Sequence, residues 1–154
     1  MTALKDKRMD KLSHKILKAL CENARISNAE IGRQVGLSPP AVGERIQKLE
    51  EQGFITGHHT AVNFDKIGLT IQAFINFKAT TVNHGELLKI VEAIPEIVEW
   101  HVITGTSCML MKVAAFTSKE LEAVIVHLNK FGETSTSLIL SRSSVQKSFG
   151  KIFN

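Results

Sequence analysis

Residues 27–53 read SNAEIGRQVGLSPPAVGERIQKLEEQG, and they contain the clearest structural signals in the first half of the chain. Residues 27–30 have the spacing of a capping box, in which a Ser and a Glu satisfy free amides at the start of a helix. Gly36 stands where that helix would end in a left-handed conformation. Ser38-Pro39 predicts a new helix start, with Ser as N-cap and Pro in the first turn. Two helices joined by a glycine turn predict a helix-turn-helix, which ends at Gly53.

A third helix is predicted in front of this motif, over residues 10–24. Apolar residues recur there at three- and four-residue steps, which is the period of an amphipathic helix. Asp10 and Ser13 are alternative N-caps for this helix. Gly32 falls where the two helices of the motif approach each other, so a missing side chain helps the approach.

The remainder of the chain has strand character. Residues 54–56 and 60–62 favour short β pieces, which predict a small ribbon and hence a winged helix-turn-helix. From residue 70 onward, alternating stretches and amphipathic stretches follow in the order β-α-β-β-α-β, which is typical of a ferredoxin-like fold. The expected strands cover residues 70–79, 96–104, 108–115 and 134–141, and the expected helices cover residues 83–94 and a segment from Ser118.

The predicted fold class is therefore α+β with two domains. The sequence favours a helix-turn-helix domain over residues 1–60, a linker over 61–69, a ferredoxin-like domain over 70–142 and a C-terminal tail over 143–154.

Composition excludes several classes of protein. The 154 residues are 44% apolar, and 19 Lys and Arg outnumber 15 Asp and Glu, giving a net charge of +4. No apolar run approaches the roughly 20 residues of a membrane span, and the N-terminus has no apolar signal region. Cys21 and Cys108 lack the spacing of a metal site or a disulfide framework. We expect a cytoplasmic protein without metal, membrane partner or enzymatic activity, since no nucleophile–base motif or phosphate-binding loop is present.

The positive charge lies mainly on the helical half. Residues 1–60 carry 10 Lys and Arg against 7 Asp and Glu, which favours a double-stranded DNA partner. Arg45 suits either a guanine edge or a phosphate, whereas a merely solvated helix face is the alternative for each single residue. The predicted DNA-binding residues are Arg33, Gln34, Ser38, Pro39, Pro40, Ala41, Gly43, Glu44, Arg45, Gln47 and Lys48.

The sequence resembles the Lrp/AsnC family of transcription factors over roughly residues 9 to 142. The residues that carry the resemblance are Ile16-Leu17, Arg25-Ile26-Ser27-Asn28, Ile31-Gly32, Val35-Gly36-Leu37-Ser38, Arg45-Ile46, Leu49-Glu50-Glu51, Gly53-Phe54-Ile55, Ile67-Gly68-Leu69, Ile94-Pro95-Glu96-Ile97, Thr104-Gly105 and Thr134-Ser135-Thr136. The resemblance implies an N-terminal DNA-binding domain and a C-terminal RAM-type domain that binds an effector and oligomerises. It also implies dimers that assemble further into tetramers or octamers.

The resemblance further implies that a small amino acid binds near the loop of residues 104–108. The effector-binding residues expected on this basis are His101, Gly105, Thr106, Ser107, Cys108, Thr134, Ser135 and Thr136. Cys108 stands where the family commonly has Asp, and a thiol cannot supply a carboxylate's charge to an ammonium group. We therefore expect weak amino-acid binding, a different effector or none. Ser13 replaces an acidic residue usual in the family, a difference expected to affect only capping.

Three functions follow from these features, in decreasing order of support. The first is a sequence-selective transcriptional regulator, modulated by an amino acid or a related small molecule. The second is an architectural protein that bends or wraps DNA with little base specificity, because Pro40, Ala41 and Gly43 offer few base-reading side chains. The third, an enzyme built around His101, Cys108 and His127, is not favoured.

Overall fold

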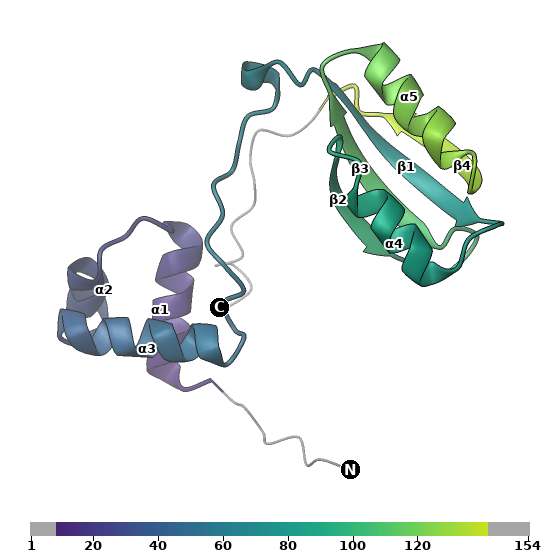
Figure 1. The fold of residues 1–154 in the computed structure, drawn as a ribbon. Coiled ribbons are helices and arrows are strands. Elements are labelled where there is room, and N and C mark those ends of the chain that lie inside the picture. Colours follow the sequence, from purple (N-terminus) through teal and green to yellow (C-terminus); the bar gives the residue numbers. More distant parts are fainter. Residues whose placement is uncertain (1–8, 142–154) are drawn as a thin grey trace, which may run out of the picture. The chain divides into compact units, whose positions relative to one another are not determined.

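A computed structural model describes residues 9–141 of the chain. The predicted C-terminal tail, residues 143–154, lies outside the described residues. The described part forms two compact units, with the boundary between Thr60 and Ala61 (Figure 1). The first unit is built from helices, and the second combines helices with a sheet.

The first unit contains the three predicted helices, α1 (Lys11–Glu22), α2 (Asn28–Val35) and α3 (Pro39–Glu51). Each begins at a capping side chain: Asp10, Ser27 and Ser38 accept hydrogen bonds from main-chain N–H groups three residues further on. Asp10, and not Ser13, is therefore the N-cap of α1. The helices enclose a small core whose buried members are Ile16, Ala19, Ile31, Val42 and Leu49.

The turn between α2 and α3 is made by main-chain contacts. Gly36 has φ 73°, and its N–H donates to the Gly32 carbonyl at 2.8 Å. The close approach predicted at Gly32 is confirmed, but its partner is the turn and not the body of α3. A Cβ on residue 32 would overlap the Leu37 carbonyl oxygen. The turn therefore requires glycine at position 32.

The ribbon predicted after α3 is wrong, because residues 54–62 contain no strand. Gly53, at φ 76°, ends α3 in a Schellman motif, in which Phe54 N–H donates to the Leu49 carbonyl at 2.8 Å. Phe54 and Ile55 then pack against the core of the first unit. Burial of these two side chains overrides the strand propensity that the sequence suggested.

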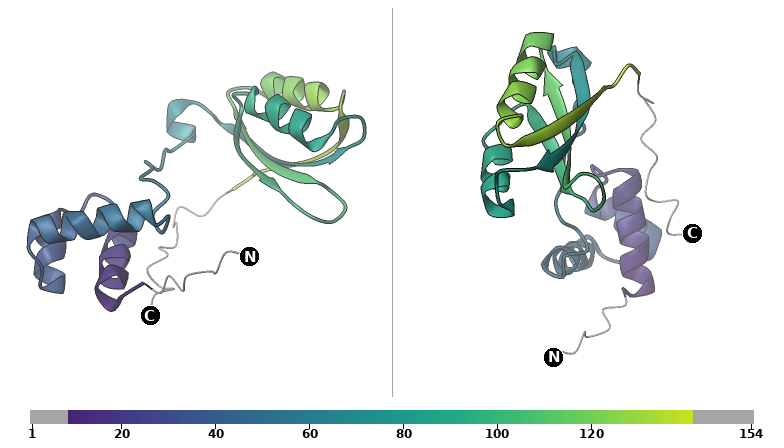
Figure 2. Two further views of the ribbon diagram at one scale, coloured as in Figure 1. Left: turned by 60° about the horizontal axis from the view of Figure 1, so that its bottom comes forward. Right: turned by 90° about the vertical axis from the view of Figure 1, so that its right-hand side faces the viewer.

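The second unit has the predicted β-α-β-β-α-β order. The elements are η1 (Asp65–Ile67), β1 (Ile71–Ala79), α4 (His84–Glu92), β2 (Ile97–Val102), β3 (Met109–Ala115), α5 (Ser118–Leu128) and β4 (Gly132–Leu138). The four strands lie in the order β2-β3-β1-β4 with every neighbouring pair antiparallel. Both helices cover one face of this sheet (Figure 2, left).

The core of this unit lies between the sheet and its two helices. Ala73, Ile75 and Phe77 of β1 are fully buried there and alternate with outward residues, as the period-two pattern predicted. Within residues 9–141, the opposite face of the sheet carries no helix. Phe74 lies on that face and is 40% exposed, with Lys112 of β3 as its neighbour in the ladder. We call this surface the open face of the sheet.

The stretch predicted as a linker is partly attached to the second unit. Gln72 Nε2 donates to Asp65 Oδ1 at 3.3 Å and to the Leu69 carbonyl at 3.4 Å. The Lys112 ammonium lies 5.7 Å from the centre of the Phe64 ring, within the range of a cation–π contact. Residues 64–69 thus form a short turn beside the start of β1.

Candidate nucleic-acid interface

The surface formed by α2, the turn and α3 gathers the predicted DNA-binding residues. Val42 and Leu49 point into the core, so the opposite side of α3 faces outward. Ala41, Gly43 and Arg45 are partly buried at the flanks of that side. The exposed members of the set are Arg33, Gln34, Ser38, Pro39, Pro40, Glu44, Gln47 and Lys48.

The first turn of α3 carries no charged side chain. No acidic residue occupies its first turn, and the Ser38 hydroxyl accepts one N–H, that of Ala41, at 3.4 Å. Pro39 and Pro40 have no N–H, and those of Ala41 and Val42 are bonded to Ser38, so the partial positive charge of this end comes from the helix dipole alone. Proline and alanine side chains there are short, which allows close approach of a duplex.

Arg33 pairs with Glu30 one turn earlier on α2, and both side chains are well exposed at 74% and 42%. The pairing lowers the pKa of the Glu30 carboxyl through the hydrogen bond from Arg33. Only the Ser27 half of the predicted capping box therefore forms, because the Glu30 side chain is directed to Arg33. An exposed pair of this kind holds weakly, so a phosphate can compete for Arg33.

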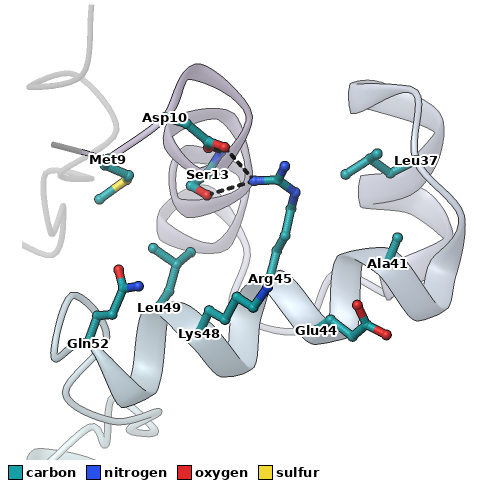
Figure 3. Close-up of a pocket in the computed structure, with 10 residues that line it drawn as sticks. All are labelled: Met9, Asp10, Ser13, Leu37, Ala41, Glu44, Arg45, Lys48, Leu49 and Gln52. Carbon is teal, nitrogen blue, oxygen red and sulfur yellow. Dashed lines mark hydrogen bonds and ion pairs between the residues drawn. The ribbon is translucent and has the colours of Figure 1, made fainter. Parts of the chain in front are cut away.

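Arg45 is held by the start of α1. Its Nη1 donates to Asp10 Oδ2 at 2.7 Å and to Ser13 Oγ at 3.2 Å (Figure 3). The hydrogen bond from Arg45, joined by the main-chain N–H of Ser13, lowers the pKa of Asp10 to about 2. The expectation that Ser13 affects only capping is wrong, since its hydroxyl contacts Arg45. Beside this contact lies a cavity of about 520 Å³ that extends along α3 to Gln52.

Two of the predicted effector residues lie on either side of the end of β1. Cys108 Sγ donates to the Phe77 carbonyl and accepts the Ala79 N–H, both at 3.4 Å. Thr134 pairs with Phe77 from the other side, in β4, and its hydroxyl donates to Asn129 Oδ1 at 2.8 Å. The Cys108 thiol is therefore occupied by the main chain of β1.

The other predicted effector residues are distributed over both faces of the sheet. His101 lies opposite Leu110 on the open face and contacts Glu99 Oε1 at 2.8 Å. Ser135 also lies on the open face, opposite Asn76, whereas its neighbour Thr136 lies on the helix-covered face. Gly105 has φ 125°, a positive value that favours glycine. Thr106 and Ser107 follow it in the loop that leads to Cys108. One chain alone does not bring all eight residues to a single cavity.

Sequence reasoning missed a groove between α4 and α5. It has a volume of about 620 Å³ and is lined mainly by apolar side chains, among them Ile90, Pro95, Val124 and Phe131. None of the predicted effector residues lines it. Apolar residues at helical spacing normally predict a buried face of the helix, so periodicity gave no sign that these side chains are partly exposed.

Among residues 9–141 there is no group of three His, Cys, Asp or Glu side chains placed to hold a metal ion. Over the same range, none of the helices has the length and apolar character needed to span a bilayer.

A helix-turn-helix followed by a β-α-β-β-α-β unit has the domain order of a DNA-binding regulator that carries a second domain. A winged helix-turn-helix DNA-binding model matches residues 9–56, and the Lrp/AsnC ligand binding domain model matches residues 72–148. The chain is 34% identical over 141 residues to the HTH-type transcriptional regulator LrpB of Bacillus subtilis, covering 92% of this chain and 93% of that protein.

Solved structures agree with this match. LrpC of B. subtilis superposes with a TM-score of 0.82 at 26% identity, covering 90% of this chain and 99% of that one. A transcriptional regulator of Neisseria meningitidis, solved with L-Met, has the same fold, with a TM-score of 0.81 at 22% identity over 92% and 96% of the two chains. The chain belongs to the Lrp/AsnC family and is a DNA-binding transcriptional regulator.

Proposed function

We propose that the chain regulates transcription by placing the start of α3 in the major groove of DNA. The observation that carries this proposal is the exposed first turn of α3. It contains no acidic residue, and its short side chains leave the helix end accessible. In helix-turn-helix proteins the N-terminal part of the recognition helix meets the base edges. The surface that would lie close to the DNA consists of Ser38, Pro39, Pro40, Ala41 and Gly43.

Outward side chains of α3 supply the base reading in this proposal. Glu44 can accept a hydrogen bond from a cytosine amino group, and Gln47 can pair with adenine once it leaves Glu51, its partner at 2.9 Å. Arg33, Gln34 and Lys48 lie around this surface and hold phosphates. Base-reading side chains are few, so DNA shape contributes to site choice.

The phosphate contacts are tested by the salt dependence of DNA binding. Each phosphate that the protein neutralises adds about 0.9 to the slope of log affinity against log salt on duplex DNA. Lys48→Gln should lower the magnitude of the slope by about this amount for every bound chain. Lys119→Gln, an exposed change in the second unit, is the matched control and should leave the slope unaltered. Equal slopes for the two variants would contradict the proposed contact.

The architectural alternative differs in its effect on DNA topology. A protein that wraps DNA changes the supercoiling of a closed plasmid in the presence of topoisomerase, and a protein that only reads a short site does not. We expect little change at protein concentrations that saturate a specific site. A large change, with equal affinity for all sequences, would favour wrapping.

We further propose that the chain acts as a dimer or a larger assembly. Support comes from the open face of the sheet, where Phe74 is exposed and Leu110 is partly exposed. Packing two such faces would bury these side chains and relate the copies by a two-fold axis. Two recognition helices could then meet successive major grooves, about 34 Å apart.

We propose an amino acid or a related small molecule as the effector, bound weakly. The ligand binding domain match supports a ligand, and the regulator from N. meningitidis was solved with L-Met. Cys108 gives no carboxylate to an ammonium group, and its thiol already contacts β1. The proposal includes no cofactor and no catalysed reaction. A thermal-shift screen of the twenty amino acids tests it, and strong stabilisation by a branched-chain amino acid would contradict weak binding.

A further inference from the structure

We infer that Arg45 serves DNA binding as a positioning residue, which fixes α3 against α1 through Asp10 and Ser13, and that it does not contact DNA. The inference rests on the proposed function, because it takes α3 as the recognition helix. It assigns Arg45 a role different from the base or phosphate contact expected from its residue type alone.

The contact joins two elements through one carboxylate. Asp10 Oδ1 accepts the Ser13 N–H at 2.7 Å and so caps α1, while Asp10 Oδ2 accepts Arg45 Nη1 at 2.7 Å. Ser13 Oγ accepts from the same Nη1 at 3.2 Å. Both oxygens of the carboxylate are in use, so the first turn of α1 and the middle of α3 are held together.

The direction of the side chain separates it from the DNA-facing surface. Arg45 extends toward Asp10 and Ser13, whereas Glu44, its neighbour on α3, points away from them (Figure 3). The Arg45 side chain is 30% exposed, while that of Arg33 is 74% exposed. Successive residues of a helix are about 100° apart, so the Arg45 and Glu44 side chains leave α3 in different directions, although both residues and Lys48 border the same cavity.

Charge also argues against a phosphate contact. Asp10 neutralises Arg45 in the free protein, so the pair adds no net positive charge for the release of counterions. Asp10 also caps α1 through the Ser13 N–H, so a phosphate at Arg45 would face a carboxylate that stays in place, and like charges repel. A fixed contact between the two helices is therefore more favourable than exchange of partners.

The test compares variants of Arg45 and Asp10 in the full chain with Lys48→Gln, using DNA affinity measured over a range of salt concentrations. A positioning role predicts that Arg45→Gln and Asp10→Asn each lower affinity by about threefold to fivefold, the scale of a partly exposed ion pair. Both should leave the salt slope unchanged. Asn remains a good N-cap, so Asp10→Asn removes the charge without removing the cap. Arg45→Lys should recover part of the lost affinity.

A DNA contact by Arg45 predicts the opposite pattern. Arg45→Gln would then lower the slope as Lys48→Gln does, and Asp10→Asn would raise affinity by releasing Arg45. Either result would overturn the inference while leaving the proposed function intact. Failure of the unmodified chain to bind DNA would overturn both. Thermal unfolding is measured for each variant to show that it is folded. The double variant Asp10→Asn with Arg45→Gln should lose no more affinity than either single variant, because both changes remove the same contact.

Discussion

The carbonyl oxygen of Leu37 lies against Gly32 so closely that a Cβ on residue 32 would overlap it. The Leu37 N–H in turn donates to the Gly32 carbonyl at 3.0 Å, so the two residues contact each other through both main-chain groups. This double contact sets the angle at which the chain leaves α2 and enters α3. The orientation of the recognition helix therefore depends on the absence of a single methyl group.

Gly32→Ala should destabilise the first unit by about 1–3 kcal/mol, the usual cost of forcing an extra carbon into a packed site. The obstacle is main chain, which cannot rotate away as a side chain can. Chemical denaturation followed by circular dichroism measures the change. Gly85→Ala in α4 is the control, since a Cβ there meets Asn83 Oδ1 at an ordinary 3.6 Å. A Gly32→Ala protein as stable as the parent would contradict the packing described.

Acid should weaken the contact between Asp10 and Arg45. The pKa of Asp10 lies at about 2 in the folded chain, below its ordinary value of 3.8. A lowered pKa means that the carboxylate stabilises the fold above about pH 4, and that this stabilisation is lost as the pH falls from about 4 to 2.

Asp10→Asn isolates this contribution because it keeps the N-cap. We expect the difference in unfolding free energy between the parent and Asp10→Asn to be constant above pH 5 and to shrink toward pH 2. Denaturation curves at closely spaced pH values provide the measurement. A difference that does not depend on pH would show that Asp10 contributes no charge interaction.

Phe74→Glu should weaken self-association. It places a charge on the open face of the sheet beside Asn76, without touching the core between the sheet and its helices. Light scattering coupled to size exclusion measures the mass. Phe116→Glu, at an exposed aromatic residue after β3, is the matched control and should leave the mass unchanged. An unaltered mass for Phe74→Glu would show that the copies associate through a surface other than the open face.

Cys108→Asp should strengthen amino-acid binding. It introduces the carboxylate that the resemblance implies three residues after the loop glycine, Gly105, and a carboxylate can hold an ammonium group. The expected result is a larger thermal shift with amino acids than the parent shows. Cys108→Ser, which is also uncharged, should respond like the parent. Equal responses from Asp and Ser would indicate that position 108 does not set effector affinity.

Local sequence signals predicted most of the fold. Caps at Ser27 and Ser38, the left-handed Gly36 and the two-residue alternation of β1 each depend on neighbours in the chain, and the structure has them as expected. The prediction of a ribbon after α3 was wrong for a non-local reason. Phe54 and Ile55 pack against the core of the helical unit, and strand propensity does not include such a tertiary contact.

The candidate site was predictable in outline and not in detail. Residue type marked Arg45 as a nucleic-acid contact, but its partner Asp10 lies 35 residues away, and that proximity follows only from the packing of α1 on α3. Cys108 was identified by position, whereas its two hydrogen bonds to β1 depend on strand pairing. Tertiary contacts of this kind are not encoded in any short motif.

A competition experiment shows whether the chain selects particular DNA sequences. The full chain is mixed with fragments of its own genome and an excess of random duplex at moderate salt, and the bound fraction is sequenced. For a sequence-selective regulator we expect strong enrichment of a small set of fragments sharing half-sites about one helical turn apart. Uniform recovery of all fragments, in proportion to their length, would contradict it.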